Sequence, residues 1–144
     1  MFKHLPLPSH PEALPAAKAA LEAQAQGRFW PYHDLLFAHQ SELTRENLLG
    51  WARGLGLEVE HFKRALDEDN HHDRLAADQE LGRKLGVRGA PIFFINGHMF
   101  KGAKPYEKFK KKVDEEMQRA DQLLESGVSR ERLYQELTQP PAVP

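Results

Sequence analysis

The side chains in this sequence that could do chemistry are eight histidines, four serines and a run of lysines, because the chain contains no cysteine. The absence of cysteine excludes disulfides, thiolate catalysis, Cys-ligated metal and Cys-x-x-Cys redox chemistry by these residues alone. Imidazole, hydroxyl and ammonium groups remain as candidates, and the chain could also bind a partner through a surface.

The histidines show no metal-binding pattern, although residues 71–73 read His-His-Asp and His61 lies ten residues earlier. No His-x-x-x-His or His-Glu-x-x-His occurs, and adjacent histidines on a helix point about 100° apart. We interpret these positions as solvated and predict no metal. We interpret His33, which is followed by Asp34, as a packing or surface residue rather than a catalytic base.

The serines offer no nucleophile pattern, since no Gly-x-Ser-x-Gly occurs. Gly54 and Gly56 lack the strand context and the third glycine of a phosphate-binding loop. Each serine stands where a helix is expected to begin or end, and capping is the interpretation for all four: Ser9, Ser41, Ser126 and Ser129.

The lysine run over residues 101–112 allows two interpretations. It could contact nucleic acid or an anionic surface, or it could be a solvated helix face whose charges pair with the acidic residues 114–116 that follow. We favour the solvated face. Lys and Arg number 20 against 21 Asp and Glu, so no global basic field exists to attract nucleic acid.

The elements that position these groups belong to one domain by length, since the chain has 144 residues. No stretch approaches 18 consecutive apolar residues, and no apolar leader follows Met1, so neither a membrane span nor a secretory signal is expected in these residues. The localisation of the protein stays open.

Helical spacing of apolar residues predicts seven helices. Ser-His-Pro-Glu at residues 9–12 predicts a capping box for the first helix, and Thr44 is expected to cap the third. Trp30 and Trp51 are expected in the core. The predicted helices span about residues 13–26, 29–40, 44–55, 59–66, 70–86, 105–126 and 129–137.

A β-hairpin is predicted between the fifth and sixth helices. The apolar run Pro-Ile-Phe-Phe-Ile at residues 91–95 is followed by Asn96-Gly97, and then by a second β-forming run at residues 98–100. Two such runs joined by Asn-Gly are a strong hairpin signal. The uninterrupted apolar run also predicts a strand that is covered on both faces.

The stretch Gly-Val-Arg-Gly-Ala-Pro-Ile-Phe-Phe-Ile-Asn-Gly at residues 86–97 resembles the C-terminal half of DsbA-like thioredoxin-fold proteins. The resemblance extends over about residues 2–120. Residues 2–7 look like the second thioredoxin strand of the family, residues 10–25 and 27–37 like helices of its inserted subdomain, and residues 102–109 like the entry to its final helix.

The resemblance implies an α-rich α/β fold, namely a truncated thioredoxin-like fold with an inserted helical subdomain and a C-terminal ββα unit. We expect a thioredoxin-like domain over residues 1–126, with the helical insertion at about residues 9–85. Residues 127–144 are expected to form a C-terminal helix and a loose Pro-rich tail.

The resemblance also implies that the first strand and the Cys-x-x-Cys helix of the family precede residue 2 and are absent from this chain. In the family that strand lies in the middle of the sheet and pairs with the strand matching residues 91–95. Without it, this strand has an open edge, which is a template for pairing. Each buried, unpaired backbone group costs about 1–3 kcal/mol. We therefore expect a homodimer or a partner chain that completes the sheet.

The loop before the strand is the candidate binding site. In the family the proline of this motif is cis, and the residue before it offers backbone hydrogen bonds to an extended peptide. Transferred to this chain, the site is Arg88, Gly89, Ala90 and Pro91. No catalytic residue, metal or cofactor is predicted.

Two functions follow from the resemblance. The family catalyses dithiol–disulfide exchange, so a chain without cysteine is predicted to be redox-inactive on its own and to act as a binding or assembly module, without nucleic acid or membrane partners. The alternative is a fragment of an active disulfide oxidoreductase whose Cys-x-x-Cys segment is missing from this chain or supplied by another. A third possibility, a Ser-dependent relative, has no support because that serine would lie in the missing segment.

Overall fold

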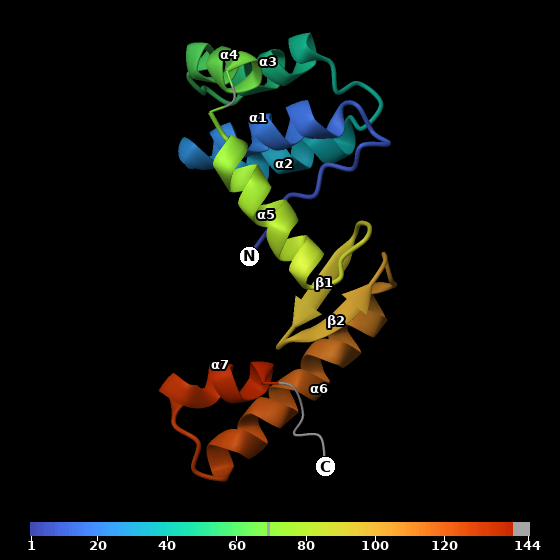
Figure 1. Ribbon diagram of the computed structural model, residues 1–144, viewed down its shortest axis with the longest axis vertical. Coiled ribbons are helices and arrows are strands. Elements are labelled where there is room, and N and C mark those ends of the chain that lie inside the picture. The colour runs from blue at the N-terminus through green and yellow to red at the C-terminus, as the bar shows by residue number, and fades with distance from the viewer. Residues whose placement is uncertain (69, 140–144) are drawn as a thin grey trace. The chain divides into compact units, whose positions relative to one another are not determined.

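The computed structural model describes residues 1–68 and 70–139, and within them the chain forms helices and one hairpin (Figure 1). It divides into two compact units, Met1–Arg88 and Gly89–Pro144. Residues 140–144 of the predicted tail, and residue 69 just before the predicted fifth helix, lie outside the described residues. The first unit contains α1 Ala13–Ala25, α2 Phe29–Ala38, α3 Arg45–Gly54, α4 Val59–Asp67 and α5 His72–Lys84; the second contains β1 Ile92–Ile95, β2 His98–Lys101, α6 Tyr106–Glu125 and α7 Arg130–Thr138.

The first unit has a helical core in which α1 packs against α2, α3 and α4. Small residues on α1, Ala19 and Ala23, let the larger side chains approach closely. Tyr32 is fully buried, and its hydroxyl donates to the carbonyl oxygen of Leu48 at 2.9 Å. This bond joins α2 to α3 and satisfies the one polar atom that the tyrosine brings into the core.

The N-terminal segment of the first unit is fastened to α5 through Asp78. The Asp78 carboxylate accepts hydrogen bonds from the Lys3 ammonium at 2.7 Å and from the backbone N–H of His4 at 3.0 Å. Its side chain is only 1% exposed. Residues 2–5 are thus held in place but form no strand, because no other strand of the described residues pairs with them.

The second unit is built on the predicted hairpin, which is confirmed. β1 and β2 are antiparallel, with Ile92 opposite Lys101 and Ile95 opposite His98. Asn96 has φ 46° and Gly97 φ 83°, the left-handed conformations that a tight two-residue turn requires.

Helix α6 covers one face of the hairpin. The ring of Phe109 on α6 lies 4.8 Å from that of Phe93 and 4.7 Å from that of Phe100, measured between ring centroids. Arg119 lies further toward the C-terminal end of α6. It donates to the Leu137 carbonyl of α7 at 3.3 Å and contacts the Nε2 of His98 at 2.9 Å. The arginine therefore links β2, α6 and α7 within this unit.

The helix-capping predictions hold only in part. Thr44 caps α3 as predicted, by accepting from the N–H of Asn47 at 3.3 Å. The capping box at residues 9–12 does not form, since no side chain caps α1. The reason is that α1 begins only at Ala13, so Glu12 rather than Ser9 stands at its N-cap position.

Several residues expected in the core are exposed instead. Trp30 is 62% exposed, because Tyr32 takes the inward position on α2 and a residue two places away points to the other side of the helix. Trp51 is partly buried against the core of the first unit, as expected. On α6, Val113 and Met117 are exposed, so only part of the predicted apolar stripe packs against the hairpin.

Candidate functional site

The predicted binding loop begins the second unit. The Ala90–Pro91 peptide bond is cis, and both residues are exposed. The carbonyl oxygen of Pro91 accepts from the backbone N–H of Gly102 at 2.9 Å, one step beyond the Ile92–Lys101 pair of the hairpin. The structure thus attaches the loop directly to the ladder of β1 and β2.

The four predicted loop residues fall on both sides of the boundary between the units. Gly89, Ala90 and Pro91 open the second unit, and Gly89 is partly buried. Arg88 is exposed and is the last residue of the first unit. The site within one unit is therefore the backbone of residues 89–91 together with the strand that follows.

The other edge of β1 carries backbone groups that point away from β2. In an antiparallel ladder, hydrogen-bonded and non-hydrogen-bonded pairs alternate. The two-residue turn makes Ile95 and His98 a hydrogen-bonded pair, and Pro91 bonds to Gly102, so residues 91, 93 and 95 face β2. The N–H and C=O groups of Ile92 and Phe94 then face outward, and no backbone partner for them occurs within residues 1–68 and 70–139.

The side chains of β1 leave apolar surface on both faces. Phe93 lies on the face covered by α6 and is still 40% exposed; Phe94 lies on the opposite face and is 41% exposed. The prediction of a strand covered on both faces is therefore wrong for the described residues. β1 carries no charged residue, whereas β2 ends in Lys101, a residue type that discourages pairing at sheet edges.

A second surface feature, an aromatic cluster in the first unit, was not predicted from the sequence. The rings of Phe2, Phe29, Trp30, His33 and Phe37 form an exposed aromatic cluster, in which His33 lies 4.5 Å from Phe37 and 5.3 Å from Trp30 between centroids. Phe37 is 59% exposed. The four-residue spacing of Phe29, His33 and Phe37 was the available signal.

His71 packs onto a buried carboxylate instead of lying in solvent, whereas His61 approaches the same carboxylate from an exposed position. The Nε2 of His71 is 3.0 Å from Glu22 Oε2, and the Nδ1 of His61 is 3.9 Å from Glu22 Oε1. The interpretation of His71 as a solvated position is therefore wrong, because Glu22 on α1 needed a partner that the sequence pattern does not reveal. The described residues contain no group of three or more His, Cys, Asp or Glu side chains that could hold a metal.

His4 is the most perturbed histidine of the first unit. Burial lowers its pKa to about 4, and the nearby Asp78 carboxylate opposes this shift only in part. The imidazole is thus neutral at physiological pH. It packs edge-on against Phe2, at 5.0 Å between centroids, which fits a structural role.

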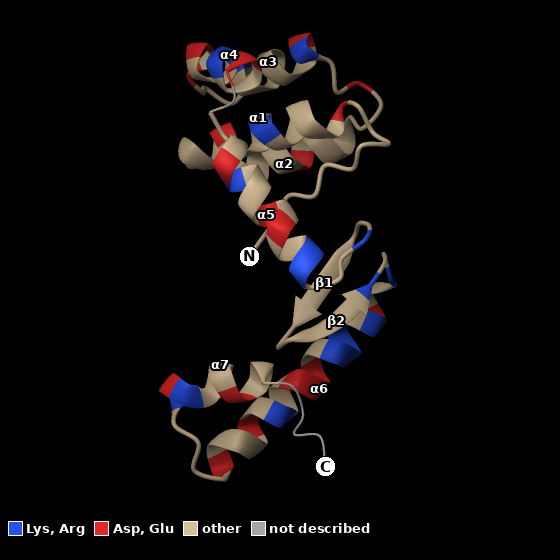
Figure 2. Cartoon of the chain, viewed as in Figure 1, with Lys and Arg blue, Asp and Glu red and all other residues tan. Residues whose placement is uncertain are grey.

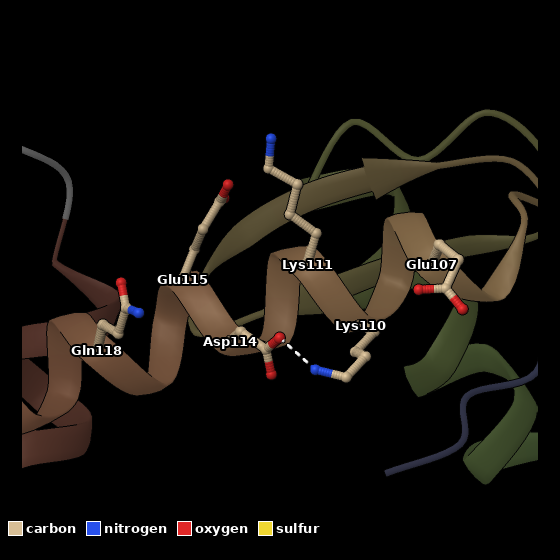
Figure 3. A pocket seen from close by; sticks show the side chains of 6 residues that line it. All are labelled: Glu107, Lys110, Lys111, Asp114, Glu115 and Gln118. Atoms are coloured by element: carbon tan, nitrogen blue, oxygen red, sulfur yellow. Dashed lines mark hydrogen bonds and ion pairs between the residues drawn. The ribbon is translucent and has the colours of Figure 1, made fainter.

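A shallow hollow lies along α6 in the second unit (Figure 3). Its charged side chains are exposed, and Lys110 pairs with Asp114 at 2.6 Å. Such an open, solvated surface does not enclose a small molecule. The residues that line it are Glu107, Lys110, Lys111, Asp114, Glu115 and Gln118.

A helical subdomain, a loop ending in a cis proline, and a hairpin covered by a long helix define a thioredoxin-like α/β protein. The sequence model of the DSBA-like thioredoxin domain matches residues 9–114, and the chain belongs to that family. The family resemblance and the fold class predicted from the sequence are thereby confirmed.

Several relatives contain a segment similar to this chain as a small part of a longer protein. The Na(+)/H(+) antiporter NhaA 1 of Salinispora arenicola is 42% identical over 104 residues, which is 72% of this chain and 16% of that protein. The Na(+)/H(+) antiporter NhaA of Herminiimonas arsenicoxydans is 39% identical over 97 residues, 67% of this chain and 16% of that protein. The chain therefore spans about a sixth of these relatives. No solved structure matches it significantly.

The described residues contain no helix that is both long enough and apolar enough to cross a membrane.

Proposed function

We propose that this chain is a redox-silent binding and assembly module of the DSBA-like family, which takes up an extended strand at the open edge of β1. The observation that carries the proposal is the pair of outward-facing residues Ile92 and Phe94, whose backbone groups have no partner in the described parts of the chain. The loop at residues 89–91 leads directly into this edge and would contact the start of the same extended segment. The chain has no thiol with which to exchange disulfides.

The strand that we propose for this edge is β1 of a second copy. The outward residues Ile92 and Phe94 are placed symmetrically about Phe93. In an antiparallel pair with Phe93 opposite its own copy, Ile92 of each protomer therefore meets Phe94 of the other as a hydrogen-bonded pair. A two-fold axis through this point joins the two hairpins into one four-stranded sheet. The edge is uncharged, so the pairing brings no like charges together.

Light scattering on a sizing column tests the proposal with two proline variants. Phe94→Pro removes an N–H from the open edge of β1, whereas Met99→Pro removes one from the far edge of β2, since residues 94 and 99 form a non-hydrogen-bonded pair. Both variants leave the β1–β2 hydrogen bonds intact. We expect wild type and Met99→Pro to have twice the mass of the 16.5 kDa chain, and Phe94→Pro to be a monomer.

The other outcomes are equally clear. A wild-type monomer, or a dimer that survives Phe94→Pro and is lost in Met99→Pro, contradicts self-pairing through β1. A wild-type monomer that binds a different chain through β1 would replace the second copy with a partner. If Phe94→Pro loses its circular-dichroism signal, Phe94→Lys provides the same test, because a lysine on an edge strand opposes pairing without removing an N–H.

The second candidate function is thiol–disulfide exchange, with the two thiols supplied by a separate Cys-x-x-Cys segment. The specific support is the family match, which includes the loop and β1, where the family binds its substrates. In that case a separate segment with a strand and a Cys-x-x-Cys helix would fill the β1 edge. Insulin reduction distinguishes the two functions: the chain alone is expected to give no rate, and a rate that appears only with a strand-plus-Cys-x-x-Cys segment of a DsbA-like relative would favour exchange.

The antiporter relatives suggest where such a module acts. We propose that it associates with a membrane transporter, because proteins named Na(+)/H(+) antiporters contain a similar segment. Ion transport itself is not assigned to this chain.

A further inference from the structure

The charges of the second unit are divided between its two halves (Figure 2). Residues 98–112 carry six lysines and one carboxylate, Glu107. Residues 113–139 carry seven carboxylates and three arginines. The unit is therefore basic around β2 and the start of α6 and acidic beyond them, a difference that the near-zero charge of the whole chain conceals.

Four of the six lysines have no ion pair within the part of the chain that the structure describes. Lys110 pairs with Asp114 at 2.6 Å and Lys112 with Glu116 at 2.7 Å, as expected for a solvated helix face. Figure 3 shows Lys110 reaching toward Asp114, while Lys111 extends away from α6. We call the four exposed, unpaired residues the lysine pole: Lys101, Lys104, Lys108 and Lys111.

Two further features add to the lysine pole. The N-terminal end of α6 lies among these lysines in the sequence. It is the positive end of the helix dipole, and no side chain caps its free N–H groups. Tyr106, the first residue of α6, is 73% exposed beside these lysines. Tyrosine is enriched at membrane–water interfaces, where its ring lies among lipid headgroups.

We propose that the lysine pole binds the phosphate surface of an anionic lipid bilayer. The charge pattern is complementary to anionic headgroups, and lysine is well suited to phosphate as a compact point charge. The choice of a bilayer over nucleic acid rests on the proposed association with a transporter. Binding here needs neither β1 nor a second copy, so it is independent of sheet completion.

Vesicle sedimentation with the full chain tests this proposal. The probe is a vesicle of phosphatidylglycerol and phosphatidylcholine mixed one to two, with pure phosphatidylcholine as the uncharged control. We expect binding to the anionic vesicle only, weakening steeply as salt is raised from low to physiological concentration. The Phe94→Pro variant, which blocks the β1 edge, is expected to bind per chain within a few-fold of wild type.

Matched charge variants locate the surface. Each lysine near an anionic bilayer contributes about fivefold to affinity, so Lys104→Gln, Lys108→Gln and Lys111→Gln together are expected to weaken binding about a hundredfold. Arg28→Gln, Arg53→Gln and Arg130→Gln remove the same charge from exposed residues elsewhere and are expected to change it less than about threefold. Equal losses in the two triple variants, equal binding to both vesicles, or tighter binding to duplex DNA than to the anionic vesicle would overturn the proposal.

Discussion

Gly102 donates its backbone N–H to the carbonyl oxygen of Pro91 at 2.9 Å, and this bond determines which backbone groups of β1 are available for binding. It continues the ladder that starts at the Asn96-Gly97 turn, so the alternation of inward and outward residues holds along the whole strand. Ile92 and Phe94 therefore face outward, next to the exposed loop at residues 89–91. In the assembly that we propose, binding at the loop and pairing at the strand edge would use one continuous surface.

Asp78→Asn is expected to release the N-terminal segment from α5. The substitution removes the charge that holds the Lys3 ammonium and weakens the acceptor for the His4 N–H, in a position where the side chain is 1% exposed. We expect a loss of about 2 kcal/mol in the free energy of unfolding, measured in urea. Glu42→Gln, on an exposed side chain, should stay within about 0.5 kcal/mol of wild type; equal effects of the two would refute the role of Asp78.

The stability of the first unit is expected to fall between about pH 6.5 and pH 4 because of His4. Burial holds the folded pKa at about 4, so the unfolded chain binds a proton below about pH 6.5 while the folded chain does not. The free energy of unfolding keeps its full value above about pH 6.5, the pKa of His4 in the unfolded chain. About 3 kcal/mol of it is lost as the pH falls to about 4, the pKa of His4 in the folded chain.

Urea unfolding at several pH values measures this loss. The groups facing His4 are Asp78, Arg74, His33 and Lys3. His4→Leu should flatten the pH profile over this range, whereas His10→Gln, at an exposed position, should leave it unchanged. An unaltered slope in His4→Leu would assign the pH dependence to another group.

Gly97→Ala is expected to destabilise the second unit by about 1–2 kcal/mol. Gly97 has φ 83°, and an added Cβ would lie 3.2 Å from the Cα of Thr138 at the end of α7. Gly50→Ala in the interior of α3 meets no atom within 4 Å and should stabilise the chain by about 0.5–1 kcal/mol. Thermal melts of the two variants should thus shift in opposite directions, and a shift in the same direction would show that the turn tolerates a side chain.

Tyr32→Phe is expected to cost about 1–2 kcal/mol at pH 7, since it leaves the Leu48 carbonyl without its cross-helix donor. Burial raises the pKa of the Tyr32 phenol, so the unfolded chain loses this proton first as the pH rises through about 10. The stability that the phenol provides is present below that pH and is lost above it. The difference between wild type and Tyr32→Phe in urea unfolding should therefore shrink at alkaline pH; a constant difference would contradict the linkage.

The sequence predicted the elements that local rules determine. The Asn96-Gly97 turn, the cap at Thr44 and the helical spacing along α6 each depend on neighbours within a few residues. The family motif around Pro91 is one continuous stretch and identified the family for a similar reason, while peptide binding by its loop stays a prediction. The domain boundary predicted after residue 126 stays a prediction.

What the sequence failed to predict depends on contacts between distant residues. Nothing in the pattern around Trp30 distinguishes it from Tyr32, yet only the tyrosine fits the space beside Leu48. Besides Gln26, four residues further along the chain, Glu22 has His71 as a partner 49 residues away, and no local rule links Glu22 to that histidine. Phe94 and Met117 are likewise exposed. Apolar periodicity predicts which residues share a face, but it does not predict which element covers that face.

A single cysteine tests the pairing of β1 most directly, because the native chain has none. In the proposed register Phe93 lies opposite its own copy in a non-hydrogen-bonded pair, where Cβ atoms approach to about 4.5–5.5 Å. Phe93→Cys should then form a disulfide-linked dimer on mild oxidation, seen on a non-reducing gel, while Ile95→Cys, which faces Pro91 of the other copy, should not. Equal cross-linking of the two variants, or none in Phe93→Cys while the chain stays folded, would contradict assembly through the open edge of β1.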